Sequence, residues 1–452
     1  MIEEQQIAPE MAIGKEHVFN FRKYAWGQFR KNKPAYWSYR ILVVLAVIAL
    51  FSPIIATDQP WYCRYKGVTM FPAFSFSNRC DIRDENGTTE VIQYDIADWK
   101  RMDVESIVFA PVPYAANKSD FDNADFVSPS GKQVLIDKDG NEKPMPWRFK
   151  HWLGTNKHGE DVLSGLITGT RISLTIGIIS MAIASLIGIF LGAIAGYFGD
   201  KRLKTTRGSF WTIVLGLILA YYYAFSVRSY EIADGFGTSS VAMLRELFYS
   251  AAIFISIVFI FYKLGKFAGK VSFLSRQVFI PVDSIVSRAI EILISMPLLI
   301  LIISISAITK EKSMINLMVI IGLTTWTGIA RLTRAEFLRI SNLEYIHAAR
   351  SLGFKEFRII FRHALPNGLA PALVAIAFGV ASAILIESSL SFLGIGVPPS
   401  TVTWGSLLSA GREQFSAWWL VIFPGLAIFI TVTVYNLLGE GLRDALDPRL
   451  KK

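Results

Sequence analysis

Cysteine, histidine and charged residues are all scarce in this sequence. Its 452 residues include two cysteines and five histidines, and only 18% of the residues carry a charge. The histidines are scattered, and no set of cysteine, histidine and acidic residues has the spacing of metal ligands. An arranged nucleophile and base are missing, as is the G-x-x-x-x-G-K-S/T loop that holds nucleotide phosphates. We therefore expect no metal, no cofactor, no enzymatic activity and no ATP binding by this chain itself.

The composition is instead typical of a membrane protein. Hydrophobic residues make up 52% of the chain and aromatic residues 13%, which is too apolar for an ordinary soluble domain. The net charge of +10 comes from short basic clusters beside apolar runs, where the positive-inside rule explains them. We expect a polytopic protein in a lipid bilayer, and no binding of nucleic acid.

Basic residues orient the first apolar run. Segment 1–40 begins with acidic residues and lacks the order of a cleavable signal peptide, so we expect it to stay in the cytoplasm. The basic residues from Arg22 to Arg40 place the start of the first span, Ile41–Ala56, on the inside. Residues 57–150 contain no run long enough to cross a bilayer and predict an extracytoplasmic domain. Strand-like stretches VIQY, SIVFA and KQVLI, with turn pairs Asn86-Gly87 and Asp139-Gly140, make that domain β-rich.

Both cysteines, Cys63 and Cys80, lie in this domain, where an oxidising compartment lets disulfides persist. A bridge between them would contribute on the order of 3 kcal/mol. Since the sequence does not give the distance between the two residues, a disulfide and two free thiols both remain open.

The rest of the chain alternates apolar runs with basic turns. Small residues such as Gly188 and Gly192 within these runs let helices pack closely. Asp283 and Glu291 lie near the inner end of one run, where we expect them to face water or an arginine. The predicted spans after the first are Ile172–Phe198, Phe210–Phe225, Leu247–Tyr262, Ile292–Ile308, Asn316–Ile329, Ala370–Ile386 and Ala417–Leu438.

A polar, basic segment, 341–366, separates two of these runs. Ser341 followed by Glu344 has the spacing of a capping box, which predicts a helix over Asn342–Leu352 that ends at Gly353. Its expected apolar face comprises Tyr345, Ala348, Ala349 and Leu352, and its polar face Glu344, His347, Arg350 and Ser351. A second apolar stripe, Phe357, Ile360, Phe361 and Ala364, predicts another helix that Pro366 stops. Periodicity alone favours a helical hairpin on the membrane surface.

The order of residues in this segment resembles the EAA loop of ABC-importer permeases. ARSLG followed by RIIFRHALPN is similar to the oligopeptide/dipeptide branch of that family, and His347 stands where the family usually has a glutamate. The resemblance implies coupling helices that dock on a cytoplasmic ATPase, through Glu344, His347, Ala348, Ala349, Arg350, Gly353, Leu365 and Pro366.

Two further stretches resemble the same family. HWLGTNKHGEDVLSGLITGTRISL, from His151 to Leu174, is similar to the segment that leads into the transport core. ESSLSFLGIGVPPSTVTWGSLL is similar to the external mouth of the pathway, which makes Glu387 and Trp404 candidates there. Glu387 either lines the route or holds a re-entrant turn together by bonding backbone amides, and the sequence leaves both open.

The resemblance implies an all-α polytopic membrane protein with a six-span ABC type I importer core. It covers the N-terminal helix and most of 151–200 and 281–452, and is closest to the second-permease type with an extra external domain. Segment 201–280 interrupts it and adds two spans, about eight in total, which we expect to pack against the outer edge of the core.

The implied function is that of a permease subunit for peptides or peptide-like solutes in the bacterial inner membrane, with both termini cytoplasmic. Its expected partners are two cytoplasmic ABC ATPase subunits, a second homologous permease and an extracytoplasmic solute-binding protein. Two alternatives remain. An ion-coupled secondary transporter should couple to its ion through acidic residues at the membrane midplane or through broken helices, and the span centres here contain no Asp or Glu. A membrane-anchored sensor or structural protein would have no need of the EAA-like segment.

Overall fold

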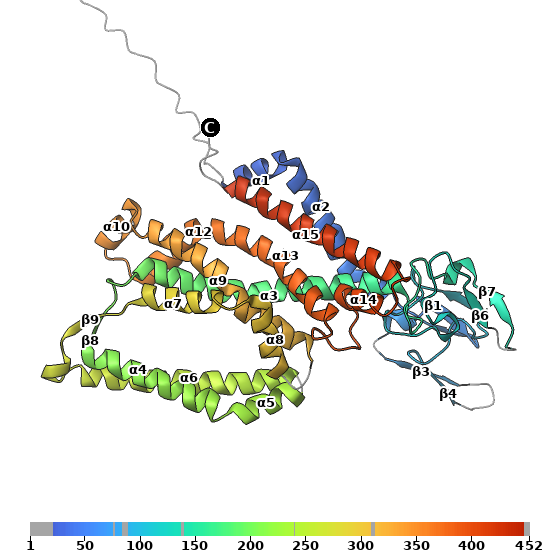
Figure 1. The fold of residues 1–452 in the computed structure, drawn as a ribbon, viewed down its shortest axis with the longest axis horizontal. Helices are drawn as coiled ribbons and strands as arrows, with labels where there is room; N and C mark the ends of the chain where they lie inside the picture. The colour runs from blue at the N-terminus through green and yellow to red at the C-terminus, as the bar shows by residue number, and fades with distance from the viewer. Residues whose placement is uncertain are drawn as a thin grey trace, which may run out of the picture.

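Long helices dominate the computed structural model, which describes residues 21–446 except 76, 84–88, 137–139, 239 and 309–311. In this part of the chain, seven helices are long and apolar enough to cross a membrane (Figure 1). They are α2 (Lys33–Ile55), α3 (Val162–Phe198), α4 (Arg207–Tyr221) with its π-helical extension to Ser226, α6 (Ser240–Ala268), α9 (Met314–Ile340), α13 (Ala370–Phe392) and α15 (Trp419–Leu446). The prediction of a polytopic, mostly helical protein is confirmed.

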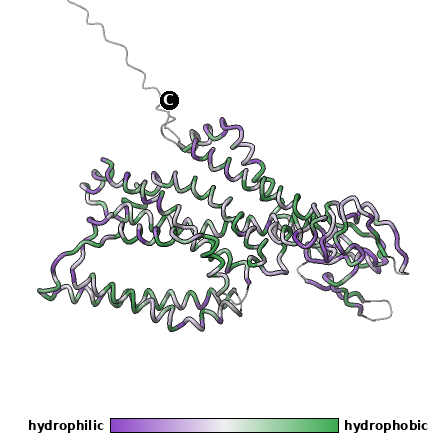
Figure 2. The backbone as a smooth tube through the Cα atoms, in the orientation of Figure 1, coloured by the Kyte–Doolittle hydropathy of each residue, from purple (hydrophilic) through white to green (hydrophobic). Residues whose placement is uncertain are grey.

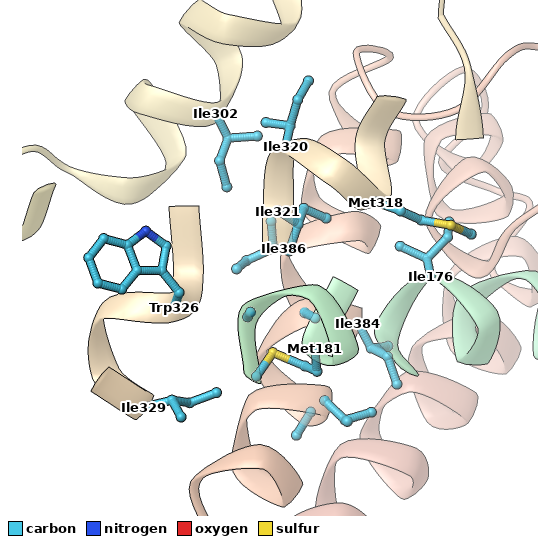
Figure 3. Packing of buried hydrophobic residues seen from close by; sticks show 14 of the residues in the cluster. Ile176, Met181, Ile302, Met318, Ile320, Ile321, Trp326, Ile329, Ile384 and Ile386 are labelled. Atoms are coloured by element: carbon cyan, nitrogen blue, oxygen red, sulfur yellow. The ribbon is translucent and has the colours of Figure 1, made fainter. Parts of the chain in front are cut away.

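The centre of the molecule is the pair of helices α3 and α9, which run parallel to each other. Three glycines of α3 lie against the α9 backbone; a Cβ on Gly192, for example, would stand 2.5 Å from the carbonyl oxygen of Ala330. Such close approach is how helices gain packing energy in lipid. The Gly188 and Gly192 pair therefore serves packing within one chain. Isoleucines and methionines of α3, α8, α9 and α13 fill the core around this pair (Figure 3).

The third predicted core span is broken rather than continuous. Helix α7 (Val282–Ile294) and helix α8 (Leu298–Ile308) meet at an angle of 85°, and only together do they qualify as a span. Pro297 explains the break, because it lacks an N–H and disfavours helical geometry in the residue before it. The predicted span Ile292–Ile308 therefore begins in the last turn of α7 and continues, after the break, as α8.

Residues 57–161 form a separate domain that holds the short strands (Figure 1). Strands appear where VIQY, SIVFA and KQVLI predicted them, but each is only three to five residues long and the sheets are small. The prediction of a β-rich domain is therefore not confirmed, because the strands are few and loops make up most of the domain. The strands are β1 (Tyr62–Tyr65), β2 (Val68–Met70), β3 (Arg79–Arg83), β4 (Thr89–Gln93), β5 (Ser106–Val108), β6 (Val134–Ile136) and β7 (Glu142–Pro144), in the sheets β2-β1-β5, β3-β4 and β6-β7, all antiparallel. Asn86-Gly87 and Asp139 lie outside the described residues.

The two cysteines are free thiols in this domain. Cys63 is buried and Cys80 half-buried, and both contribute to one small hydrophobic cluster with Tyr94 and Trp99. Burial raises the pKa of the Cys63 thiol and so keeps it in its unreactive protonated form. A disulfide between Cys63 and Cys80 stays a prediction.

Segment 201–280 folds back on itself as a helical hairpin. Helices α4, α5 (Ser229–Thr238) and α6 pack on one another, and strands β8 (Lys204–Thr206) and β9 (Gln277–Phe279) pair at its base. Figure 1 shows the hairpin as a layer beside the core, and Figure 2 shows it as apolar along most of its length. Among the described residues, the substantial contacts of the hairpin are between its own helices and with the β8–β9 pair at its base. The expected packing against the outer edge of the core is therefore not observed.

The two ends of the described chain lie together. Helix α1 (Phe21–Lys31) and the start of α2 pack on α15, where Asn32 Nδ2 donates to Asp444 Oδ2 at 3.1 Å. The short helices α10 (Glu344–Ser351), α11 (Glu356–Ile359) and α12 (Leu365–Gly368) lie at the same end of the molecule, opposite the 57–161 domain (Figure 1). The molecule thus has a loop end and a domain end, and α3 runs between them.

Candidate functional site

Segment 341–366 forms short helices, but it does not begin as predicted. Ser341 caps the C-terminus of α9, and its hydroxyl donates to the carbonyl of Leu338 at 3.0 Å. Helix α10 starts after Leu343 without a side-chain cap. The predicted capping box between Ser341 and Glu344 is therefore wrong, because α9 extends further than its apolar run and takes Ser341 as its last turn. Gly353 adopts the expected left-handed conformation, with φ of +76°.

The buried face of the loop is offset from the predicted one. Ile346, Ala349 and Ile359 pack against Tyr197, Phe337 and Ile340 at the ends of α3 and α9. Of the predicted apolar face only Ala349 is buried; Leu352 is 73% exposed. Two apolar stripes share α10, and tertiary contact rather than periodicity selects the one that faces inward. The other stripe is exposed, as are the phenylalanines that follow α10. Together they form what we call the exposed loop surface, which consists of Tyr345, Ala348, Leu352, Phe354, Phe357 and Phe361.

Pro366 does not stop the second helix. A π-helical turn, Ile360–Ala364, precedes it, and Leu365 and Pro366 open α12, which leads almost directly into α13. Proline fits the first turn of a helix because the N–H it lacks would have no partner there. Leu365 is half-buried and packs against the loop core.

A set of polar side chains ties the loop to α3, and we call it the loop network: Tyr197, Arg202, Arg350 and Glu356. Arg350 Nε donates to Glu356 Oε1 at 3.1 Å, and its guanidinium lies 5.1 Å from the centre of the Tyr197 ring. The Tyr197 hydroxyl donates to the other oxygen of Glu356. Glu344 and His347, by contrast, point into solvent.

Arg202 closes this network from the end of α3. It donates to the Tyr197 carbonyl, and its Nη2 donates to the Ser341 carbonyl at 3.3 Å and to Asn342 Oδ1 at 3.2 Å. Burial and the nearby charge of Arg350 lower the pKa of Arg202. The sequence analysis missed Tyr197, Arg202 and Glu356, because no motif marks them and the hydrogen bonds that tie them to the other side of the network link residues far apart in the chain.

Acidic residues beside the loop pair as expected. Asp283 accepts two hydrogen bonds from Arg334 of α9, one of them at 2.7 Å, and Glu291 pairs with Arg288 at 2.6 Å. Asp200 accepts from the backbone and the hydroxyl of Ser284, and these bonds lower the pKa of Asp200.

Glu387 and Trp404 are both buried near the domain end. Glu387, on α13, accepts hydrogen bonds from Ser173 of α3 at 3.1 Å and from Ser391 at 2.8 Å. Trp404 begins α14 (Trp404–Gly411), and its indole donates to the carbonyl of Leu166 at 3.1 Å. The two residues join α3, α13 and the short helix α14, with serine hydroxyls in place of the backbone amides considered for Glu387.

A second set of polar side chains joins the 57–161 domain to α3, and we call it the domain network: Asp120, His151 and Asp161. The fully buried His151 ring places Nδ1 2.9 Å from Asp161 Oδ1 and Nε2 3.1 Å from Asp120 Oδ2. Asp161 also caps α3, accepting from the Ser164 N–H at 2.7 Å. Burial lowers the pKa of His151, but the two carboxylates outweigh it and raise the pKa overall. Among the described residues no group of histidine, cysteine and acidic side chains could hold a metal ion.

Comparison with known proteins adds a family. A model of the binding-protein-dependent transport system inner membrane component matches residues 262–452, and one of the N-terminal transmembrane domain of oligopeptide transport permease C matches 20–66. The chain is 29% identical to the inner membrane ABC transporter permease protein YejE of Escherichia coli over 428 residues, 94% of this chain and 96% of that protein. It is 30% identical to the glutathione transport system permease protein GsiD of Pectobacterium atrosepticum over 330 residues, 73% of this chain and 82% of that protein. A peptidoglycan transport system permease protein of Agrobacterium fabrum is 26% identical over 443 residues, 94% and 93% of the two chains.

Proposed function

This chain belongs to the family of binding-protein-dependent transport system inner membrane components and is a permease subunit of an ABC importer, and on that premise we propose that it imports peptides or peptide-like solutes. ATP hydrolysis takes place in partner subunits. The relatives named for glutathione and for peptidoglycan transport share solutes that contain amide-linked amino acids. That shared chemistry supports the substrate class.

The proposal that this loop docks an ATPase rests on the exposed loop surface. Soluble surfaces rarely present large contiguous apolar patches, and such a patch marks a contact with another protein or with lipid. Phe357 is 72% exposed, and Phe354 and Phe361 beside it are exposed as well. Helix α10 of this loop lies at the end of the molecule opposite the 57–161 domain (Figure 1). Two ABC ATPase subunits are the proposed partners, one for this loop and one for the second permease. Glu344, His347 and Arg350 then lie on or beside the docking face.

The break between α7 and α8 supports a second permease chain. Helix α7 spans about 20 Å, so its end falls within a hydrocarbon core about 30 Å thick. In the described chain the helical hydrogen-bond pattern resumes only where the Leu301 N–H donates to the Pro297 carbonyl at 3.0 Å. Backbone polar groups at this depth must meet protein or water rather than lipid. Residues Ser295 to Ile300 are nevertheless exposed, which fits a partner permease or the pathway it would share.

The proposed topology has eight spans, with six in the core and two in the 201–280 hairpin. Both termini and the loop end are cytoplasmic, and the 57–161 domain lies outside, where it would meet a solute-binding protein. The basic residues that flank the loop end favour this orientation. Neither an ion-coupled secondary transporter nor a membrane-anchored sensor is retained, because the family assigns the permease role.

Uptake measurements test the substrate class. Cells that lack this chain should lose uptake of isotope-labelled short peptides and regain it with the wild-type chain. If uptake of peptides is unaffected while that of another solute fails, the peptide assignment is wrong and the permease role stands.

A further inference from the structure

Among the described helices, α3 reaches from the 57–161 domain at its first turn to the loop at its last. Its 37 residues give it a length of about 55 Å at 1.5 Å per residue. The domain network holds its first turn, and the loop network holds its last turn through Tyr197. No other described helix has a polar network at each end that leads to these two regions.

From this arrangement we infer that α3 transmits the docking of a solute-binding protein on the 57–161 domain to the ATPase-docking loop, and that His151 and Tyr197 are the positioning residues at its two ends. The inference rests on the proposed function, because it needs both partners. It assigns the domain an active part in coupling.

The 57–161 domain is bound firmly enough to the first turn of α3 that the two should move together. Besides the domain network, the Ser164 hydroxyl donates to the Tyr114 carbonyl at 2.8 Å, and the Gln133 side chain exchanges two hydrogen bonds with the His151 backbone. Displacement of the domain therefore acts on the first turn of α3 rather than on a slack linker.

The helix itself is stiff along its path. It is α-helical from Val162 to Phe198, and three of its glycines, Gly188, Gly192 and Gly196, lie against the α9 backbone. Packed interfaces shift between discrete arrangements rather than stretching. A displacement at Asp161 should thus reach Tyr197, which bonds Glu356 and lies against Arg350 in the loop.

The test is ATPase activity of the complete importer in lipid vesicles, with and without its binding protein. In Asp120→Asn the bond to His151 is weakened where the domain meets α3. Basal activity should stay within about twofold, whereas stimulation by the binding protein should fall by roughly fivefold or more, the range of a typical coupling energy. Asp122→Asn is the matched control, because Asp122 pairs with Arg101 inside the domain; it should keep full stimulation.

A second variant covers the case in which Asp120→Asn fails to assemble. Tyr197→Phe removes the hydroxyl that bonds Glu356 and leaves the domain untouched, and the ratio of stimulated to basal activity should again fall. Normal stimulation in either assembled variant would overturn the inference. If the wild-type chain assembles with no ATPase at all, the proposed function fails as well, so the two failures are distinguishable.

Discussion

At the scale of single residues, His347 is the loop's departure from the glutamate usual in its family. It is exposed on α10, one turn after Glu344. On the proposed docking face its imidazole would contribute shape or a hydrogen bond. Its place beside an existing carboxylate makes a second negative charge unfavourable, since like charges three residues apart repel on a helix.

We predict that His347→Glu does not improve coupling. ATPase activity of the vesicle-reconstituted importer should stay within about twofold of wild type or fall, because the new carboxylate adds a repulsion of a few tenths of a kcal/mol. Ser351→Glu, on the same helix, controls for added charge. An increase of several-fold with His347→Glu would instead mark the histidine as a weakened contact.

His151 makes the join between domain and α3 depend on pH. Because its pKa is raised in the folded protein, its stabilisation is complete below its ordinary pKa of about 6.5 and is lost as pH rises through the folded pKa. Asp120 acts in the opposite sense. Burial raises its pKa, but the hydrogen bonds from His151 and Asn123 and the nearby charges of Lys100 and His151 together outweigh burial and lower the pKa, so the contribution of Asp120 is lost only in acid.

The domain network should therefore weaken above neutral pH. We predict that the difference in thermal midpoint between wild type and His151→Gln shrinks from about pH 6 to about pH 9. Lys100, whose pKa burial lowers to about 8, loses charge in the same range. Its Nζ lies 3.5 Å from the centre of the Tyr114 ring, which packs at a tilt against the His151 ring. The comparison is therefore made in a Lys100→Met background. A difference that stays constant across this range would show that His151 is not charged.

At the scale of elements, the α3 and α9 pair depends on small residues. Gly192 leaves no room for a side chain against Ala330 and Thr333, whereas a Cβ at Gly328 of α9 would meet open space. Gly192→Leu should destabilise the chain by at least the 1–3 kcal/mol typical of overpacking, seen as a lower thermal midpoint in detergent. Gly328→Leu should leave the midpoint close to wild type. If Gly192→Leu and Gly328→Leu changed the thermal midpoint equally, the close packing of α3 on α9 at Gly192 would not be what stabilises the pair.

Element positions followed from the sequence more reliably than element ends or faces. The apolar runs located the spans because a bilayer demands about 20 apolar residues. Pro297 was visible within one run, yet the run's uniform hydrophobicity concealed that the chain turns there. On α10 the sequence held two apolar stripes, and only the packing of Ile346 against α3 and α9 decides between them.

At the scale of the whole molecule, family and function were predictable because the residue order of one short segment, 341–366, is typical of the family. The two networks were not, since Tyr197 and Glu356 are 159 residues apart and Asp120 and His151 are 31 apart. Such pairs leave no periodicity to read. The sequence predicted the α4–α6 hairpin as two added spans, but it did not predict that the hairpin lies as a layer beside the core.

The central claim is that the exposed loop surface docks an ABC ATPase. It is tested most directly by purifying the tagged chain from its host in mild detergent and measuring the ATPase that remains bound. The wild-type chain should retain ATPase subunits, and Phe357→Asp should lose about tenfold or more, since a buried hot-spot residue contributes 2 kcal/mol or more. The matched change Phe273→Asp, at an equally exposed aromatic residue near the base of the hairpin, should retain them. If the wild-type chain binds no ATPase, or Phe357→Asp binds it as well as wild type, the account is contradicted.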